Sequence, residues 1–264
     1  NKARVQTKDQ SGERPLLDGN HSFERLNSGL GFTYQLSTAA ALYAGIYQAS
    51  RAPTPVELAC SHSEAPCNLP NTFLADPPLD DVVSLSYEVG IRGQTKYIDQ
   101  IHIGLFHTVN QDDILFQTSG GVLSNQGFFT NAADTRRLGL ELNLTGMGDH
   151  WSWFANYSYL RATFEDAFLS SSPNHPYAKN GEVPVNSGSQ IPGIPEHNFK
   201  LGVDSRFSDR LNGSIDMRIN SGQYIRGDEA NLEKKNRLLS SSKYFAELSS
   251  KSSPQFNNGS KKSF

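Results

Sequence analysis

The chain has 264 residues, enough for one large all-β domain or two smaller domains. Its formal net charge of -3 combines 24 Lys and Arg with 27 Asp and Glu, so the charge balance gives no indication of a nucleic-acid partner. No run of about 18 apolar residues is present, which excludes a membrane-spanning helix. The negative mean hydropathy does not exclude a membrane β-barrel, because only alternate residues of its strands face lipid.

The chain begins Asn1-Lys2-Ala3-Arg4, without a methionine and without a recognisable signal peptide, which suggests a processed product or a fragment. The first 20 or so residues are polar and irregular, and we expect a loop or the end of an earlier strand there. Beyond them, alternating apolar and polar residues predict eight strands. These strands cover 26–36, 40–49, 83–92, 101–116 with a bend near 110–113, 127–144, 151–159, 199–204 and 213–220.

The clearest alternation lies in residues 135–144. Four leucines share one side of this predicted strand, and Arg137, Gly139, Glu141 and Asn143 share the other. A soluble sheet with one wet face would produce this pattern, and so would a membrane barrel with lipid outside and a polar lumen.

The connections between the predicted strands favour the membrane barrel. Short ones alternate with long ones: 37–39, 94–99, 146–150 and 208–210 are short, and 53–81, 118–126 and 166–195 are longer. Outer-membrane barrels have short periplasmic turns and long outer loops in this way. Several predicted strands are also long enough to cross a bilayer at a tilt. Trp151, Trp153, Tyr157 and Tyr159 would supply part of an interfacial aromatic girdle, or else ordinary sheet packing.

Two cysteines, Cys60 and Cys67, lie in a proline-rich stretch. We expect a small loop disulfide, which implies an oxidising compartment, with two free thiols as the alternative. A zinc site would need more ligands than this pair and His62. The Asp80-Asp81 and Asp112-Asp113 pairs lack the spacing of a calcium loop, so no metal is assigned.

Four segments add a family resemblance. They are Arg51–Leu58, Tyr87–Gly93, the strand containing Asp112-Asp113-Ile114, and Arg137–Glu141. In this order and spacing they resemble the carboxy-terminal part of the barrel of TonB-dependent outer-membrane receptors, over about residues 20–232. That family has a 22-stranded barrel closed by an amino-terminal plug. The resemblance therefore implies an all-β, antiparallel transmembrane barrel portion of about eight strands, in the outer membrane of a Gram-negative bacterium.

The resemblance also implies a function. Such receptors take up ferric siderophores, haem, cobalamin or sugars by active transport, without covalent chemistry, so the chain is expected to be neither an enzyme nor a cofactor protein. The implied partners are outer-membrane lipid, the transported ligand, and the TonB complex through an amino-terminal region missing here. Glu88 and Glu141 match barrel glutamates that pair with plug arginines. These two residues, with Arg92 and Arg137, would face the plug, or otherwise only a wet lumen.

Arg51, Tyr177, Lys179 and Arg226 lie in predicted outer loops and are candidate contacts for an anionic chelate, or simply solvated loop residues. A passive porin, another outer-membrane barrel, a soluble β-sandwich and an outer-membrane enzyme remain alternatives. For the enzyme, Asp166 or Asp228 would have to approach one of the histidines His62, His175 and His197, and no spacing identifies a nucleophile and base.

Residues 1–232 are expected to form the partial barrel. Residues 233–264 are rich in serine and lysine and show no evident alternation, so we expect a disordered or frameshifted tail. An incomplete barrel leaves open strand edges that lipid cannot hydrogen-bond, and the chain alone is not expected to transport.

Overall fold

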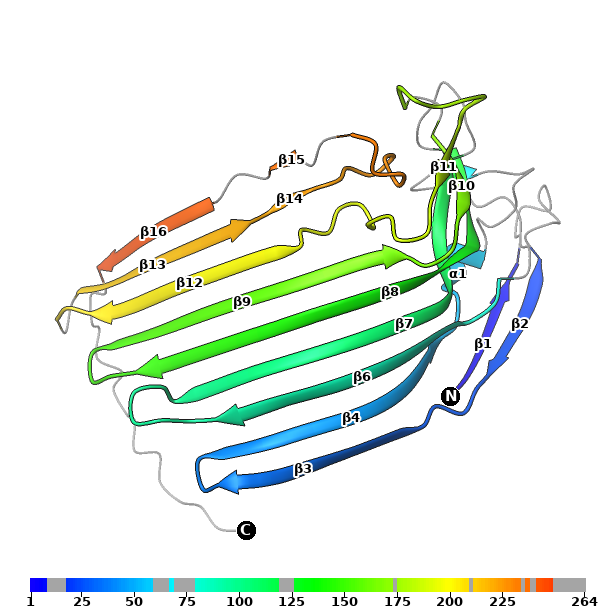
Figure 1. Ribbon diagram of the computed structural model, residues 1–264. Coiled ribbons are helices and arrows are strands. Elements are labelled where there is room, and N and C mark those ends of the chain that lie inside the picture. Colours follow the sequence, from blue (N-terminus) through cyan, green and yellow to red (C-terminus); the bar gives the residue numbers. More distant parts are fainter. Residues whose placement is uncertain are drawn as a thin grey trace, which may run out of the picture.

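The structure is a computed structural model dominated by one curved antiparallel sheet (Figure 1). It describes residues 1–8, 18–58, 67–68, 79–118, 126–172, 175–208, 211–233, 236–237 and 241–248. The sheet has ten strands in the order β16-β13-β12-β9-β8-β7-β6-β4-β3, with β5 pairing β8 beside this path. Because every step along the path is antiparallel, neighbouring strands are joined by hairpin-type connections.

The strands of this sheet are β3 (Gly29–Ser37), β4 (Ala40–Arg51), β5 (Cys67–Asn68), β6 (Val82–Gly93), β7 (Gln100–Thr118), β8 (Gln126–Met147), β9 (Trp151–Phe164), β12 (His197–Arg206), β13 (Leu211–Asn220) and β16 (Ser241–Leu248). Three small hairpins lie outside it: β1 (Lys2–Thr7) with β2 (Gly19–Glu24), β10 (Phe168–Ser171) with β11 (Glu182–Val185), and β14 (Gly222–Gln223) with β15 (Asn236–Arg237). The one helix in the described part is α1 (Pro55–Leu58).

All eight strands expected from the alternation are present, as β3, β4, β6, β7, β8, β9, β12 and β13. The bend expected near residues 110–113 is an irregularity in the register of β7 and β8, where Asp112 has a φ of 55°. One extra residue on β7 is followed by one extra residue on β8, and irregularities of this kind bend strands as a β-bulge does.

Two segments differ from the sequence-based expectation. The amino-terminal segment, where we expected a loop or the end of an earlier strand, forms the two paired strands of the β1–β2 hairpin, whose Val5 and Phe23 pack on a buried cluster under the next loop. Within the segment expected to be a disordered tail, Ser241–Leu248 pairs with β13 as β16. The register places Tyr244 opposite Ile215 and Ala246 opposite Gly213, so a short period-two pattern is present there after all.

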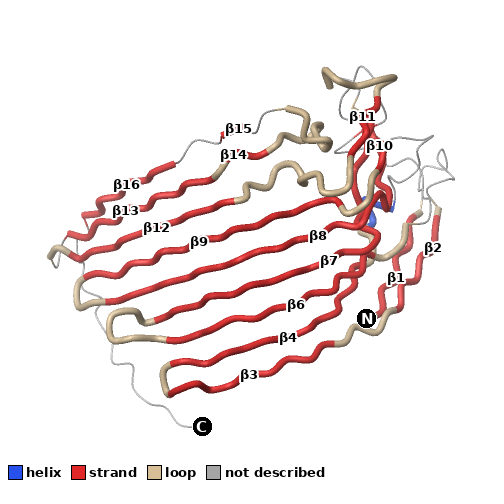
Figure 2. Tube along the Cα trace, viewed as in Figure 1, coloured by secondary structure: helices blue, strands red, loops and turns tan. Residues whose placement is uncertain are grey.

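The connections are sorted by length between the two ends of the sheet (Figure 2). The strand ends that flank the short connections 38–39, 94–99, 148–150 and 207–210 all lie at one end, which we call the turn end. The strand ends that flank the longer connections 52–81, 119–125, 165–196 and 221–240 lie at the other, the loop end. No helix in the described part of the chain is long and apolar enough to cross a membrane.

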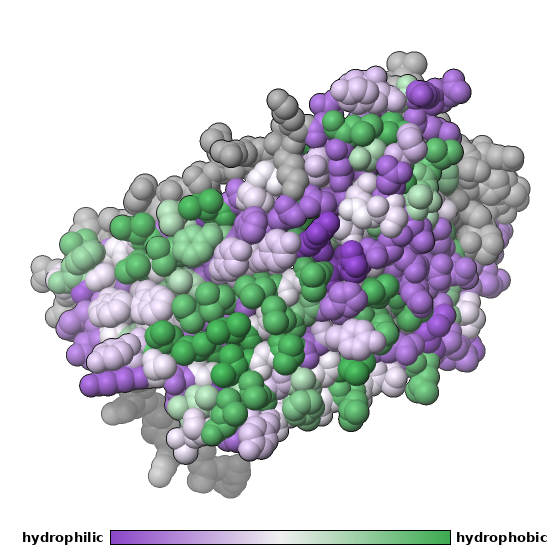
Figure 3. All heavy atoms as spheres, viewed as in Figure 1, coloured by the Kyte–Doolittle hydropathy of each residue, from purple (hydrophilic) through white to green (hydrophobic). Residues whose placement is uncertain are grey.

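One face of the sheet is apolar and uncovered. A register row on this apolar face runs across eight strands through Tyr34, Leu42, Ile91, Ile103, Leu142, Tyr157, Phe199 and Ile219. Figure 3 shows apolar side chains gathered over the middle strands of the sheet. Leu30 is 79% exposed and Phe32 is 65% exposed. A β-sandwich would bury such a face against a second sheet, and no such sheet is present among the described residues.

The buried clusters lie instead at the loop end. One contains Leu58, Leu79, Val82 and Ile114. The other contains Ala133, Phe164 and Val185. They fix the loop segments onto the extended ends of β7, β8 and β9, and thereby position the residues described next.

Candidate functional site

The face opposite the apolar face carries the polar groups, and we call it the polar face. Its central register row crosses six strands through Arg92, His102, Asn143, Asn156, Lys200 and Arg218. Each residue of this row is the neighbour in sequence of a residue in the apolar row, as Arg92 is of Ile91. The two rows lie on opposite faces because side chains alternate between the faces of a strand. The two faces therefore differ in polarity across the whole sheet.

A side-chain network at one end of this row centres on His102. The Tyr43 hydroxyl lies 2.8 Å from His102 Nε2, and Asn143 Nδ2 lies 3.2 Å from His102 Nδ1. The Arg92 guanidinium carbon lies 4.4 Å from the centroid of the Tyr43 ring, within range of a cation–π contact. Tyr43 reaches His102 only because β6, the strand between them, carries glycine here: a Cβ on Gly90 would lie 2.4 Å from the Tyr43 hydroxyl.

Glu88 and Glu141 share the polar face with Arg92 and Arg137, as their sequence parity indicated. Both glutamates are exposed, and in the described part of the chain neither makes an ion pair or a side-chain hydrogen bond. Carboxylates of this kind are available to a partner that covers the polar face. That role stays a prediction.

Arg137, in contrast, has partners within the sheet. Its guanidinium donates to Thr135 Oγ1 at 3.0 Å and to Asp113 Oδ2 at 3.4 Å. Thr135 Oγ1 also donates to Asp113, at 2.7 Å. This cluster fixes the register shift between β7 and β8, so Arg137 has a structural contact beside its predicted plug-facing role.

The neighbouring residue, Asp112, lies on the loop side of the register shift, where other carboxylates act on it. Burial, together with the carboxylates of Asp134, Asp80 and Asp81, raises the pKa of Asp112. The Arg25 guanidinium binds Asp81 through two nitrogens, and these bonds hold the pKa of Asp81 below its usual value. No group of three His, Cys, Asp or Glu side chains in the described ranges is arranged to hold a metal ion.

Arg51, the first candidate ligand contact, ends β4 and binds Glu57 at 2.7 Å. Thr54 and Glu57 form a capping box around α1, because each backbone amide donates to the other side chain. Burial acts to raise the pKa of Glu57, but the bonds from Arg51 and Thr54 outweigh it and hold that pKa low. The Arg51–Leu58 motif is thus a folded loop start that inserts Leu58 into a buried cluster.

The other three candidates lie near a polar clasp that joins two loops. His175 Nε2 lies 3.2 Å from Asp228 Oδ1, and the two side chains are 4% and 2% exposed. Asp228 also accepts the amides of Leu232 and Glu233. Ser172 Oγ donates to the Gly227 carbonyl at 2.6 Å. The connection 165–196 and the segment 221–233 are therefore held together as one unit.

Tyr177 is 59% exposed beside the clasp, with its ring 5.8 Å from that of His175. Lys179 pairs through its backbone with Glu182 in the same loop, and Arg226 lies in the turn just before Gly227. The clasp thus brings the segments of Tyr177, Lys179 and Arg226 into one region, whereas Arg51 belongs to a separate loop.

The histidine–aspartate approach considered for an enzyme is present at His175 and Asp228. However, the Tyr177 amide donates to His175 Nδ1 at 3.2 Å, so Nε2 carries the ring proton and donates to Asp228. Both ring nitrogens are engaged in structural bonds, and neither faces a nucleophile.

The sequence did not indicate Tyr43, His102 and Asn143 as a cluster, because they lie on three strands and His102 is 59 and 41 residues away from the other two. The sequence indicated only that His102 and Asn143 alternate with apolar residues and therefore belong to the polar face of their strands. Cys60 and His62 lie outside the described residues, and only the backbone of Cys67 is described, so the predicted disulfide stays untested.

Comparison with known proteins gives a family match and a fold match. The family model "TonB dependent receptor-like, beta-barrel" matches residues 2–249. Among curated proteins none matches the sequence.

Among solved structures, the ferric yersiniabactin uptake receptor FyuA from Yersinia pestis aligns with a TM-score of 0.57 at 18% identity, over 88% of this chain and 32% of that one. The copper transporter OprC aligns with a TM-score of 0.60 at 16% identity, over 88% and 32%. The siderophore receptor PiuA from Acinetobacter baumannii aligns at 0.56 and 17%, over 86% and 29%. The chain thus spans about a third of the length of these structures.

The adjacent aspartates at the register shift give a matched pair of predictions. Asp112→Asn removes a carboxylate that three others repel and keeps a side chain that tolerates positive φ, so the free energy of unfolding should stay equal or rise at pH 7.5. Because the folded-state pKa of Asp112 is raised, this gain should disappear as the pH falls below about 4, where the carboxyl is protonated in both states.

Asp113→Asn should instead lower the free energy of unfolding by about 1–3 kcal/mol, since it weakens the bonds to Thr135 and Arg137. Urea unfolding in detergent micelles at pH 7.5 and pH 4 measures both variants. Equal effects of the two substitutions would contradict this assignment.

Loss of the clasp should expose the two loops to protease. Asp228→Ala removes the acceptor of His175 and of two backbone amides, so trypsin should cleave after Lys179 and Arg226 several-fold faster than in the unsubstituted protein. Cleavage after Arg206, at the turn end, is the internal reference, and Asp204→Ala is the matched substitution. A general rise in cleavage at all three sites would show loss of the fold rather than of the clasp.

Proposed function

Because the chain belongs to the TonB-dependent receptor-like β-barrel family, we propose that it forms part of the wall of a receptor for TonB-dependent uptake of a ligand such as a ferric siderophore. The family is one of outer-membrane receptors of Gram-negative bacteria, and we place this chain in that membrane. The observation that supports the proposal is the opposite polarity of the two faces of a wide sheet whose connections are sorted by length.

In this proposal the polar face lines the barrel lumen and receives the plug. Glu88 and Glu141 offer carboxylates that make no ion pair with any described residue, which suits cationic groups of a plug domain. The row through Arg92, Lys200 and Arg218 would bind acidic or hydrogen-bonding groups of the same domain. Contact with TonB would be made by the plug, so no residue of this chain is assigned to it.

The ligand would be recognised at the loop end. Lys179 and Arg226 would supply positive charge and Tyr177 an aromatic surface, on two loops that the His175–Asp228 clasp holds together. Such a surface suits an anionic metal chelate. Two of the three structures described above are receptors for iron chelates by their titles and the third is a copper transporter, which agrees with a metal complex as cargo.

The reaction would be binding and passage, without covalent change. The His175–Asp228 pair does not suggest hydrolysis, because both ring nitrogens already have partners. The sheet path ends at β3 and β16 rather than closing on itself. Its open edges would need further strands in lipid, so we expect that the 264-residue chain does not transport by itself.

The test is uptake of ⁵⁵Fe, presented as hydroxamate and catecholate complexes, by cells that express the longest product of the gene. We expect saturable uptake of at least one complex that stops when a protonophore collapses the proton gradient. The double variant Lys179→Glu/Arg226→Glu should lower uptake at least several-fold, because it reverses the charge of the proposed ligand surface.

The matched control is Lys96→Glu/Arg206→Glu, which makes the same charge change at the turn end. Uptake that continues unchanged with the protonophore would contradict the receptor and favour a passive porin. Equal loss in both double variants would contradict the assignment of the ligand surface.

A further inference from the structure

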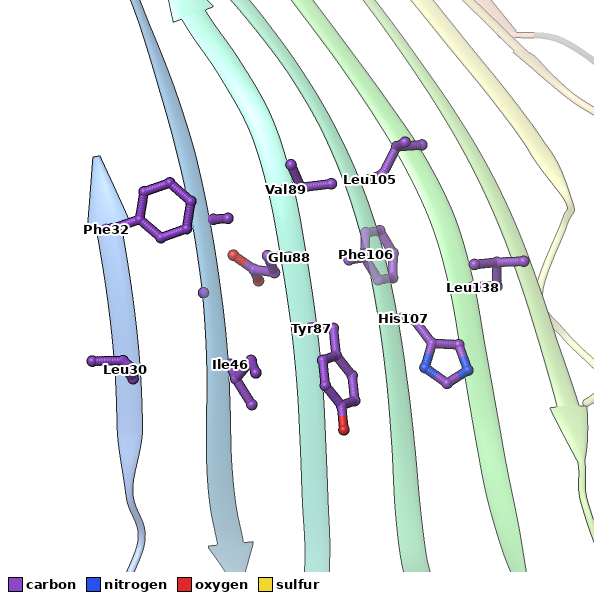
Figure 4. A pocket seen from close by; sticks show the side chains of 12 residues that line it. Leu30, Phe32, Ile46, Tyr87, Glu88, Val89, Leu105, Phe106, His107 and Leu138 are labelled. Atoms are coloured by element: carbon purple, nitrogen blue, oxygen red, sulfur yellow. The ribbon is translucent and has the colours of Figure 1, made fainter. Parts of the chain in front are cut away.

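The apolar face is not uniformly convex: it contains a groove of about 450 Å³ across the strands from β3 to β8. Figure 4 shows its side chains in two rows, with Glu88 and Phe106 between them. Those that line it include Leu30, Phe32, Ile46, Tyr87, Val89, Leu105, His107 and Leu138. The volume falls in the range of roughly 300–1,000 Å³ typical of small-molecule sites.

One of these rows leads directly to a cation. The register continues from Leu30 through Ile46, Tyr87, His107 and Leu138 to Arg161 on β9. All six positions share the apolar face. The Tyr87 and His107 rings lie 6.2 Å apart between the apolar end of the row and Arg161. The groove therefore has a hydrocarbon floor and a polar, cationic border.

Arg161 also stands at a defined level of the sheet. Trp151 and Arg161 are ten residues apart on β9 and share this face. At a rise of about 3.3 Å per residue and a tilt of about 35–45°, ten residues cover about 23–27 Å along the membrane normal. This matches the apolar band of about 25 Å in outer-membrane barrels. With the tryptophan at the turn-end border, Arg161 lies at the loop-end border.

No described residue neutralises the charge of Arg161 through an ion pair. Its neighbour Arg136 is paired with Glu165 at 3.2 Å, and His197 in the next row bonds to Tyr157. Glu196, on the adjoining segment, accepts a bond from Gln190. In the described part of the chain Arg161 makes no ion pair and no side-chain hydrogen bond. A guanidinium at a lipid border without a carboxylate partner is suited to a phosphate.

We propose that this groove and Arg161 form a specific site for a phosphate-bearing lipid of the leaflet at the loop end. An acyl chain occupies the groove between β3 and β8, and the Arg161 guanidinium binds the headgroup phosphate, while His107 lies two strands away in the same row. The site needs an occupant that is apolar over most of its length and anionic at one end, which a lipid provides. This inference rests on the proposed function only in placing the apolar face in a membrane.

The experiment uses the longest gene product, purified in detergent and freed of lipid. Binding of bisphosphorylated lipid A is measured by native mass spectrometry, with phosphatidylethanolamine as the lipid of no net charge and inorganic pyrophosphate as a headgroup without chains. We expect lipid A to bind in preference to both. Arg161→Gln should weaken this binding about five- to tenfold, as expected for loss of one cation near a lipid phosphate.

Arg206→Gln, the same substitution at the turn end, should leave binding unchanged, and Val89→Trp should weaken it by filling the groove. Equal binding by the Arg161 and Arg206 variants, or equal retention of phosphatidylethanolamine, would overturn the site. Pyrophosphate binding as tight as that of lipid A would also overturn it, because the groove would then contribute nothing. Uptake in cells tests the receptor separately, since a protein that imports no ligand can still retain lipid A through Arg161.

Discussion

Satisfaction of backbone hydrogen bonds between neighbouring strands is the constraint on which this structure depends. A strand in lipid has no water to bind its amides and carbonyls, so each must pair with the next strand. The continuous registers from β3 to β16 meet this need. The same registers align side chains of one kind across the sheet, which produces one face suited to lipid and another suited to water and a plug.

Both faces carry function only where this regular pattern is interrupted. Gly90 on β6 and Gly104 on β7 let Tyr43 of β4 reach across β6 to His102, and a Cβ at Gly90 would collide with the Tyr43 hydroxyl. The register shift at Asp112 turns β7 and β8 toward the loops. On the apolar face, Arg161 ends a row of hydrocarbon side chains. Each interruption of the regular strand pattern places a polar group at a position that this pattern alone does not predict.

The alternation predicted the strands well because period two is a local property. It predicted the polar parity of Glu88, Arg92, Arg137 and Glu141 for the same reason. It could not predict the clasp, since His175 and Asp228 lie 53 residues apart and approach through irregular backbone. The β1–β2 hairpin was missed because its apolar residues are few and pack on a distant cluster. Arg161 was overlooked as an ordinary strand residue, since only the register shows which groove it borders.

The most direct test of the account is the environment of consecutive positions on β6. Single cysteines at positions 84–89 and 91, in a protein with Cys60 and Cys67 replaced by serine, would be spin-labelled in outer-membrane lipid and their exposure to oxygen and to a water-soluble nickel reagent measured. Positions 85, 87, 89 and 91 should favour oxygen, and positions 84, 86 and 88 the nickel reagent. A profile without this alternation, or with all seven positions open to the nickel reagent, would contradict a sheet with one face in lipid.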